Sequence, residues 1–181
     1  MTILLGLTGS VATTLAPKLV SELGACGTVE VVVTECAKFF FRAADIGAQI
    51  WTDADEWRGE RYVKDQSVLH IELRQRADLL VIAPCTADML AALATGRAHN
   101  LLTSVVRAWD RDKPLIIAPA MNTFMWQHPA TEEHLATLRR WYGHKLVIVP
   151  PIAKRLACGD QGIGALAQLD TIVQAVQTAL A

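Results

Sequence analysis

The sequence predicts an α/β fold with one open parallel sheet and helices on both of its faces. Short apolar runs rich in valine, isoleucine and leucine recur along the 181 residues, and stretches with helical spacing of apolar residues separate them. The length corresponds to one domain, and we find no internal repeat, linker or low-complexity segment. We therefore expect a single domain over residues 1–181.

Five apolar runs are the candidate strands. They are unbroken rather than alternating, which is typical of strands buried on both faces of a parallel sheet. Three of them are followed directly by a proline. The runs are Ile3–Leu7, Val29–Val33, Leu79–Ala83, Leu115–Ala118 and Leu146–Val149.

Four helices are expected between and after these strands. Val11–Leu23 follows the first strand and Ala87–Leu101 follows the third. Thr131 is expected to cap a further helix, because two acidic residues follow it in the first turn. The last helix is expected to begin near Asp170. The alternation of strands and helices predicts a flavodoxin/Rossmann-like three-layer sandwich.

The composition excludes several classes of protein. Apolar residues make up 52% of the chain and charged residues 19%, which excludes a disordered protein. The net charge is −1 without a basic stripe, so no nucleic-acid partner is expected. No basic segment precedes the first apolar run, as a signal peptide requires, and no run reaches the ~18 residues of a membrane span. We expect a cytoplasmic protein that binds no membrane.

The cysteines are widely spaced and form neither a Cys-x-x-Cys pair nor a zinc pattern with histidines. This favours free thiols in a reducing compartment, and no metal site is expected. The four cysteines are Cys26, Cys36, Cys85 and Cys158.

Small and hydroxylated residues follow the carboxyl ends of the predicted strands, where open parallel sheets bind ligands. Gly9 and Ser10 join the first strand to the first helix. Backbone N–H groups and a hydroxyl at a helix start suit a phosphate, although an ordinary tight turn accounts for the same residues. Thr34 and Thr86 occupy equivalent places after the second and third strands. Three such positions at one edge favour a phosphate-bearing cofactor.

Four other residues each allow a structural and a functional interpretation. His70 lies between apolar residues, as both structural and catalytic histidines do. Cys158 precedes three glycines within six residues, so it is either a bystander thiol or a thiol acid on a turning loop. Asn122 directly after a strand fits a helix cap as well as a binding group, and Met125 fits core packing as well as a site.

Taken together and in order, these segments resemble the homo-oligomeric flavin-containing cysteine decarboxylases, and among them the phosphopantothenoylcysteine decarboxylases of eukaryotic type. The resemblance covers essentially residues 2–170. The combination of Pro119-Ala120-Met121-Asn122 with a later Ala157-Cys158-Gly159-Asp160 is its most specific part. Further matching segments are 68–73, 100–103, 107–110 and 154–156.

The resemblance implies bound FMN and a homotrimer with active sites between subunits. It implies that His70 is catalytic and that Cys158 donates a proton from a substrate lid at about residues 153–167, which would also exclude water. The implied substrate-binding residues are Asn122, Met125, Arg155 and Ala157. The implied cofactor-binding residues are Gly9, Ser10, Val11, Thr34, Thr86, Ala87, Asp88, Met89 and Ala120.

The implied activity is decarboxylation of 4'-phosphopantothenoylcysteine, a small-molecule substrate, to 4'-phosphopantetheine in coenzyme A biosynthesis. A cysteine carboxylate has no electron sink when it loses CO2, and oxidation of the C–S centre by a flavin supplies one. One alternative is a peptidyl-cysteine decarboxylase, against which the segment 154–158 argues. The other is a regulatory, phosphatase-inhibiting flavoprotein subunit, for which we expect a long acidic extension that this sequence does not show.

Two positions depart from the family pattern. Thr86-Ala87-Asp88-Met89 replaces the usual Ser-Ala-Asn-Thr, so a carboxylate that cannot donate a hydrogen bond stands at Asp88 in place of an amide. His99 stands where an aspartate usually precedes Asn-Leu-Leu. Both changes bear on flavin binding and turnover.

Overall fold

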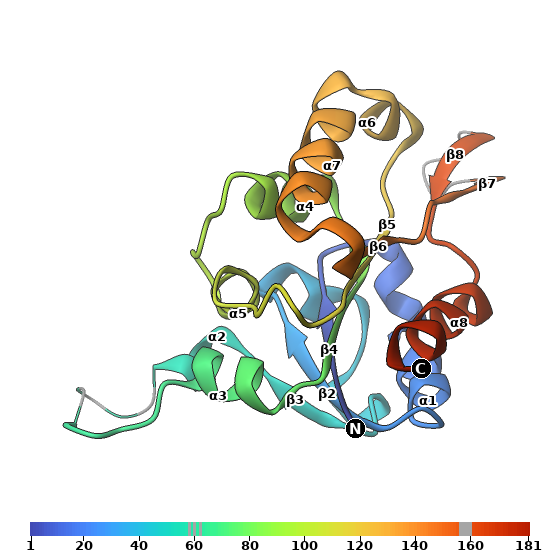
Figure 1. Cartoon of the computed structure of the whole chain (residues 1–181). Coiled ribbons are helices and arrows are strands. Elements are labelled where there is room, and N and C mark those ends of the chain that lie inside the picture. Colours follow the sequence, from blue (N-terminus) through green and yellow to red (C-terminus); the bar gives the residue numbers. More distant parts are fainter. Residues whose placement is uncertain (58, 60, 62, 156–160) are drawn as a thin grey trace.

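The structure is a computed structural model that describes residues 1–57, 59, 61, 63–155 and 161–181. In this part of the chain, six parallel strands form one sheet in the order β3-β2-β1-β4-β5-β6 (Figure 1). The predicted open parallel α/β fold is confirmed. The strands are β1 (Thr2–Leu7), β2 (Thr28–Val33), β3 (Gln49–Trp51), β4 (Leu79–Cys85), β5 (Leu115–Pro119) and β6 (Leu146–Ile148).

Helices cover both faces of the sheet, so the central strands are buried on both sides. Leu5 of β1 packs into the core beneath α1 (Ala16–Leu23) and α8 (Leu169–Leu180), whereas its neighbour Leu4 packs into the opposite core. Successive side chains of a strand point to opposite faces, which explains the unbroken apolar runs. The opposite core lies beneath α3 (Leu69–Arg76), α4 (Ala87–Ala94), α5 (Leu101–Arg107) and α7 (Pro129–Tyr142).

Short elements connect these layers. The helices α2 (Asp53–Glu56) and α6 (Thr123–Gln127) each make little more than one turn. No helix in the described ranges is both long and apolar enough to cross a membrane. The 3-10 helices are η1 (Val11–Leu15), η2 (Glu35–Phe40), η3 (Ala43–Asp45) and η4 (Gly143–Lys145).

Sequence analysis missed three strands. β3 has only three residues, which are exposed or partly buried at the sheet edge, so it lacks the apolar run that marks the inner strands. The other two overlap the predicted lid region 153–167: β7 (Ile152–Arg155) and β8 (Gln161–Ala165) pair antiparallel there. This hairpin projects beyond the carboxyl ends of the sheet strands, beside α6 (Figure 1).

The helix predicted over residues 87–101 is confirmed from Ala87, but its predicted end is wrong. α4 ends at Ala94, and Gly96 has a φ of +68°, a conformation that favours glycine after a helix. The chain then starts α5 at Leu101. Asn100 caps this helix: its Oδ1 accepts from the Thr103 N–H at 2.8 Å, and the Thr103 hydroxyl accepts from the Asn100 N–H at 3.0 Å.

The helix start predicted at Thr131 is also wrong. α7 begins at Pro129, a residue favoured at the first position of a helix, and His128 caps it through Nδ1, which accepts from the Ala130 N–H at 3.2 Å. Thr131 instead lies in the first turn, where its hydroxyl donates to the Met125 carbonyl at 2.7 Å. The predicted first helix is confirmed only from Ala16, because Val11–Leu15 forms the 3-10 helix η1.

The Asn100 cap yields a test of the fold. Asn100→Ala removes the side-chain acceptor for the buried Thr103 N–H, so the free energy of unfolding should fall by about 1 kcal/mol. Urea unfolding at a fixed protein concentration measures this change. Asn100→Asp keeps the acceptor and serves as the control. Equal unfolding midpoints for Asn100→Ala and the parent protein would contradict the assigned role of the cap.

Candidate active site

The strand order reverses at β1, which pairs with β2 on one side and with β4 on the other. Open α/β sheets bind ligands at this point, outside the carboxyl ends of the strands. A buried hydroxyl joins the two strand ends there. The Thr8 Oγ1 donates to the Pro84 carbonyl at 2.6 Å and accepts from the Thr86 N–H at 3.2 Å.

The turn after β1 brings backbone close to the chain that follows β2. A Cβ on Gly9 would lie 2.5 Å from the Cβ of Cys36, so only glycine fits without a shift of the turn. Ser10 caps η1, where its Oγ accepts from the Ala12 N–H at 3.3 Å. The buried Thr13 hydroxyl donates to the Thr8 carbonyl at 2.6 Å and thereby stabilises the turn. Val11 begins η1 and is exposed.

Two predicted threonines lie at the same edge. The Thr34 hydroxyl follows β2 and donates to the Leu7 carbonyl at 3.3 Å. Thr86 follows β4 and caps α4, where its Oγ1 accepts from the Met89 N–H at 3.2 Å. Within the described ranges, the Ser10 and Thr86 hydroxyls act only as acceptors. Each therefore keeps its O–H proton for a ligand, as a phosphate or flavin site requires.

The remaining predicted cofactor-binding residues in the first turn of α4 differ in how exposed they are. Ala87 is partly buried and Asp88 is exposed, whereas the Met89 side chain is buried in the core beneath α3, α4, α5 and α7. The Met89 N–H is already bonded to Thr86, so this residue offers a ligand little. Ala120 is buried after β5, and its N–H donates to the Cys85 carbonyl at 3.0 Å.

Two cysteines flank this edge but differ in exposure. Cys85 ends β4, and burial raises the pKa of its thiol to about 12, so it stays protonated and unreactive near neutral pH. Cys36 is exposed and lies against Gly9. Sequence analysis did not connect Cys36 with this turn, because the two residues are neighbours only through the pairing of β1 with β2.

The segment after β5 carries the predicted substrate-binding residues. Asn122 caps α6, where its Oδ1 accepts from the Phe124 N–H at 2.8 Å, so the cap interpretation is confirmed. Met125 is 48% exposed and its neighbour Phe124 is 75% exposed. Core packing of Met125 is therefore wrong, and α6 presents an apolar surface to a ligand or a partner.

The β7–β8 hairpin packs directly on this segment. The Met121 N–H donates to the Gly164 carbonyl at 2.9 Å. A Cβ on Gly164 would overlap the Met121 carbonyl oxygen, and one on Gly162 would overlap the buried Thr123 hydroxyl. These glycines therefore serve close packing rather than a mobile loop. Arg155 ends β7, and the predicted residues Ala157 and Cys158 lie outside the described residues.

His70 lies in the first turn of α3, against a carboxylate that sequence analysis missed. Its Nδ1 is 2.6 Å from the Glu56 Oε1, and its backbone N–H donates to the Glu56 Oε2 at 3.0 Å. Only the tertiary packing of α2 on α3 reveals this pair. In Figure 1, α2 and α3 lie at one end of the molecule and α6 at the other. One chain therefore does not bring His70 to Asn122.

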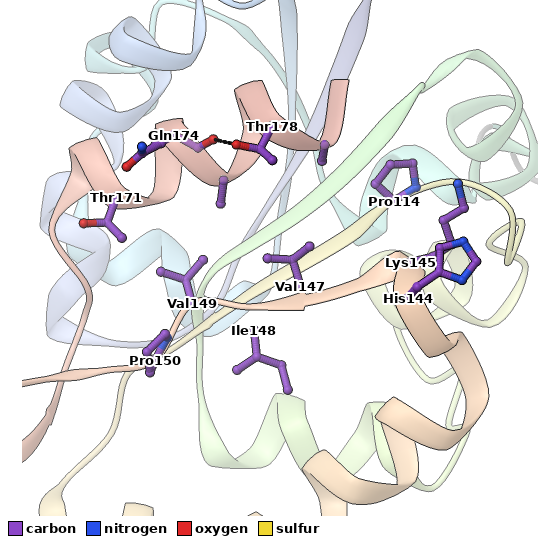
Figure 2. Close-up of a pocket in the computed structure, with 12 residues that line it drawn as sticks. Pro114, His144, Lys145, Val147, Ile148, Val149, Pro150, Thr171, Gln174 and Thr178 are labelled. Atoms are coloured by element: carbon purple, nitrogen blue, oxygen red, sulfur yellow. Dashed lines mark hydrogen bonds between the residues drawn. The ribbon is translucent and has the colours of Figure 1, made fainter. Parts of the chain in front are cut away.

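A groove beside β6, an edge strand of the sheet, contains none of the predicted site residues. It runs between β6 and α8, with Val147, Val149 and Pro150 on one side and Gln174 and Thr178 on the other (Figure 2). No group of three or more metal-ligating side chains occurs among the residues that the structure describes. The chemistry-bearing side chains thus gather at the switch point, on α6 and at the start of α3.

Comparison with known proteins identifies the family of this chain. The family model described as Flavoprotein matches residues 1–181. Phosphopantothenoylcysteine decarboxylase from Mus musculus is 47% identical over 180 residues, which cover 98% of this chain and 86% of the mouse protein.

Two solved structures are similar in fold and sequence. One is a cysteine-to-serine mutant of PPC decarboxylase complexed with pantothenoylaminoethenethiol, with a TM-score of 0.93, 42% identity and coverage of 98% of this chain and 96% of the other. The second, the FMN-binding protein AtHal3, has a TM-score of 0.88, 44% identity and coverage of 98% and 95%. The chain belongs to the flavoprotein family, in the group of the phosphopantothenoylcysteine decarboxylases.

Proposed function

We propose that this protein decarboxylates 4'-phosphopantothenoylcysteine to 4'-phosphopantetheine in coenzyme A biosynthesis, with FMN as its cofactor. The observation that carries the proposal is the switch point itself. There, the hydrogen bonds of the buried Thr8 hydroxyl and the packing of Gly9 against Cys36 fix the positions of Gly9, Ser10 and Thr86, as a phosphate-bearing cofactor requires. The similarity to phosphopantothenoylcysteine decarboxylases over nearly the whole chain supports the substrate.

The residues present fit FMN. Cys36 lies so close to Gly9 that no side chain fits there, and the turn therefore presents its backbone to a ligand. The start of η1 offers N–H groups to a phosphate. Ser10 and Thr86 add two hydroxyl donors. When bound, FMN supplies a two-electron acceptor for the C–S centre of the substrate. Ala120 and Thr34 would line the flavin by virtue of their places after β5 and β2.

Asn122 is suited to hold the substrate carboxylate. Its cap on α6 engages Oδ1 and thereby fixes the plane of the amide, whose nitrogen is a hydrogen-bond donor. A neutral donor positions a carboxylate without the strong ion pair that would stabilise it against loss of CO2. The exposed Met125 lies one turn further along α6 and would contact the remainder of the substrate.

Two exposed apolar surfaces support assembly into a ring. One surrounds the connection from α2 to α3, where Trp57 is 80% exposed and Val68 is also exposed; the other is the surface of α6. They lie at opposite ends of the molecule (Figure 1). A head-to-tail contact between different surfaces closes into a ring when the rotation between neighbouring subunits closes, and the proposed homotrimer requires this rotation. A homotrimer built in this way would bring His70 of one subunit beside Asn122 of the next.

Gly9→Ala tests the cofactor site. The added methyl group overlaps the Cys36 Cβ and forces the turn to shift, so the affinity for FMN should fall by about 5- to 100-fold. Quenching of flavin fluorescence in a titration measures the dissociation constant. Gly24→Ala, at the residue that caps the end of α1 and has helical backbone angles, is the control. The double variant Gly9→Ala/Cys36→Gly removes the overlapping atom and should recover part of the affinity.

A colourless wild-type protein that fails to take up added FMN would refute the cofactor assignment. Unchanged affinity in Gly9→Ala would refute the placement of the phosphate at this turn.

Trp57→Asp tests the assembly. Wild-type protein should scatter light as a particle of three times the 19.7 kDa chain mass, and the variant as a smaller one, because a charge replaces an apolar contact between subunits. The exposed position predicts a folded variant. Gln177→Asp adds the same charge on α8 and should leave the trimer intact. A wild-type monomer with full activity would count against the composite site.

Cys158→Ser tests the last step of the reaction. A serine hydroxyl is a far weaker acid than a thiol, so this variant should release CO2 but fail to protonate the product carbon. The flavin absorbance should bleach and stay bleached, and the product should be an enethiol two hydrogens lighter than phosphopantetheine. The PPC decarboxylase mutant complexed with an ethenethiol supports this expectation. Normal product from Cys158→Ser, identified by mass spectrometry, would exclude the acid role.

Measurement of CO2 release also tests the alternative of a peptidyl-cysteine decarboxylase. A peptidyl-cysteine decarboxylase would release CO2 from a peptide ending in cysteine and leave phosphopantothenoylcysteine unchanged. The proposed enzyme does the reverse.

A further inference from the structure

The Glu56 carboxylate holds His70 at two points. One oxygen accepts from the His70 backbone N–H at 3.0 Å, and the other lies 2.6 Å from the ring Nδ1. The Glu56 side chain is only 9% exposed, whereas the imidazole is 26% exposed. The pair therefore consists of a shielded carboxylate and a partly exposed imidazole ring.

The position of Glu56 is set by other polar contacts of α2. Thr52 and Asp55 form a capping box at the start of this helix, in which the Thr52 N–H donates to the Asp55 Oδ2 at 2.7 Å. The Asp53 Oδ1 accepts from the Leu101 N–H at 2.8 Å and fastens α2 to the start of α5. A helix of four residues has little stability of its own, so these bonds determine where its last carboxylate lies.

The double contact determines which ring nitrogen carries the proton. An ionised carboxylate is only an acceptor, so Nδ1 must be the donor in the 2.6 Å contact. In the neutral imidazole, the other nitrogen, Nε2, then has a free electron pair and is an acceptor. To cap α3, Glu56 needs only to accept from the His70 backbone N–H. The contact of its second carboxylate oxygen with the imidazole ring serves no capping purpose.

We propose that Glu56 is a positioning residue that holds His70 as the Nδ1–H tautomer and presents Nε2 as the proton acceptor for the substrate thiol. The inference rests on the proposed function for the identity of the substrate. In this step the S–H bond breaks and an N–H bond forms at Nε2, so the ring becomes an imidazolium and the sulfur a thiolate. The Glu56 carboxylate, which already faces Nδ1–H, stabilises the new positive charge.

The tautomer itself is the first readout. In protein labelled with ¹⁵N-histidine, the neutral His70 ring should show a protonated Nδ1 and an unprotonated Nε2 before cofactor or substrate is added. His70→Asn identifies the signals among the five histidines. Glu56→Ala should replace the single tautomer by an exchanging mixture. A wild-type ring protonated at Nε2, or an unchanged tautomer in Glu56→Ala, would overturn the proposal.

Turnover is the second readout. Glu56→Ala should lower kcat by about 10- to 100-fold, the range known for loss of a hydrogen-bond partner that orients a metal-bound histidine, with little change in KM. Glu56→Gln keeps the shape and one acceptor oxygen, and should also lose activity because its amide cannot neutralise the imidazolium. Rapid mixing should show that the loss lies in the bleaching of the flavin, before CO2 is released.

Glu72→Gln is the matched control. Glu72 supplies the same negative charge to the first turn of α3, and in the described structure it makes no hydrogen bond to the His70 ring. If Glu56 acted only on the start of the helix, both substitutions would change kcat equally, and the proposal would fail. If the wild-type protein does not turn over phosphopantothenoylcysteine, the proposed function fails, whereas the tautomer measurement still decides the role of Glu56.

Discussion

The buried hydroxyl of Thr8 is the contact on which the rest of the site depends. It joins the ends of β1 and β4 at the point where the strand order reverses, by donating to Pro84 and accepting from the Thr86 N–H. A hydroxyl can do both at once, whereas a valine of the same shape would leave two buried backbone groups without partners. From this joint, Thr86 starts α4 and Ser10 starts η1. The positions of Ser10 and Thr86 at the proposed cofactor site thus depend on one polar side chain, Thr8, inside an apolar sheet.

The distribution of the candidate site residues over the chain is the reason to propose that activity depends on assembly. The helices α2 and α3, which carry the Glu56–His70 pair, lie at one end of the molecule, and α6, which Asn122 caps, lies at the other (Figure 1). Both ends carry exposed apolar side chains, Trp57 and Phe124, whose exposure costs free energy in water. In the homotrimer that we propose, the association that buries them would also complete the site. The stability of the single domain and the completeness of the active site would then be separate properties of the protein.

Sequence analysis predicted the elements whose signal is local. Inner strands such as β1 and β4 show as apolar runs because both faces are covered. The helix break at Gly96 was missed, because apolar spacing continues across it into α5. Glu56 was missed for a different reason: fourteen residues separate it from His70, and only the packing of α2 on α3 brings them together. The resemblance to a family singles out His70, but no local signal in the sequence singles out Glu56, which contacts it.

The glycines of the β7–β8 hairpin show how one pattern can serve two purposes. Glycine-rich sequence predicts a turning loop, yet Gly162 and Gly164 are required because β8 lies against Thr123 and Met121 without room for a Cβ. The backbone of the hairpin is thereby bonded to the segment that positions Asn122. The strand that ends at Arg155 pairs with β8, so both strands share this anchor. Any displacement of the hairpin must consequently move or break the Met121–Gly164 bond, and would thereby shift the segment that we propose to hold the substrate carboxylate.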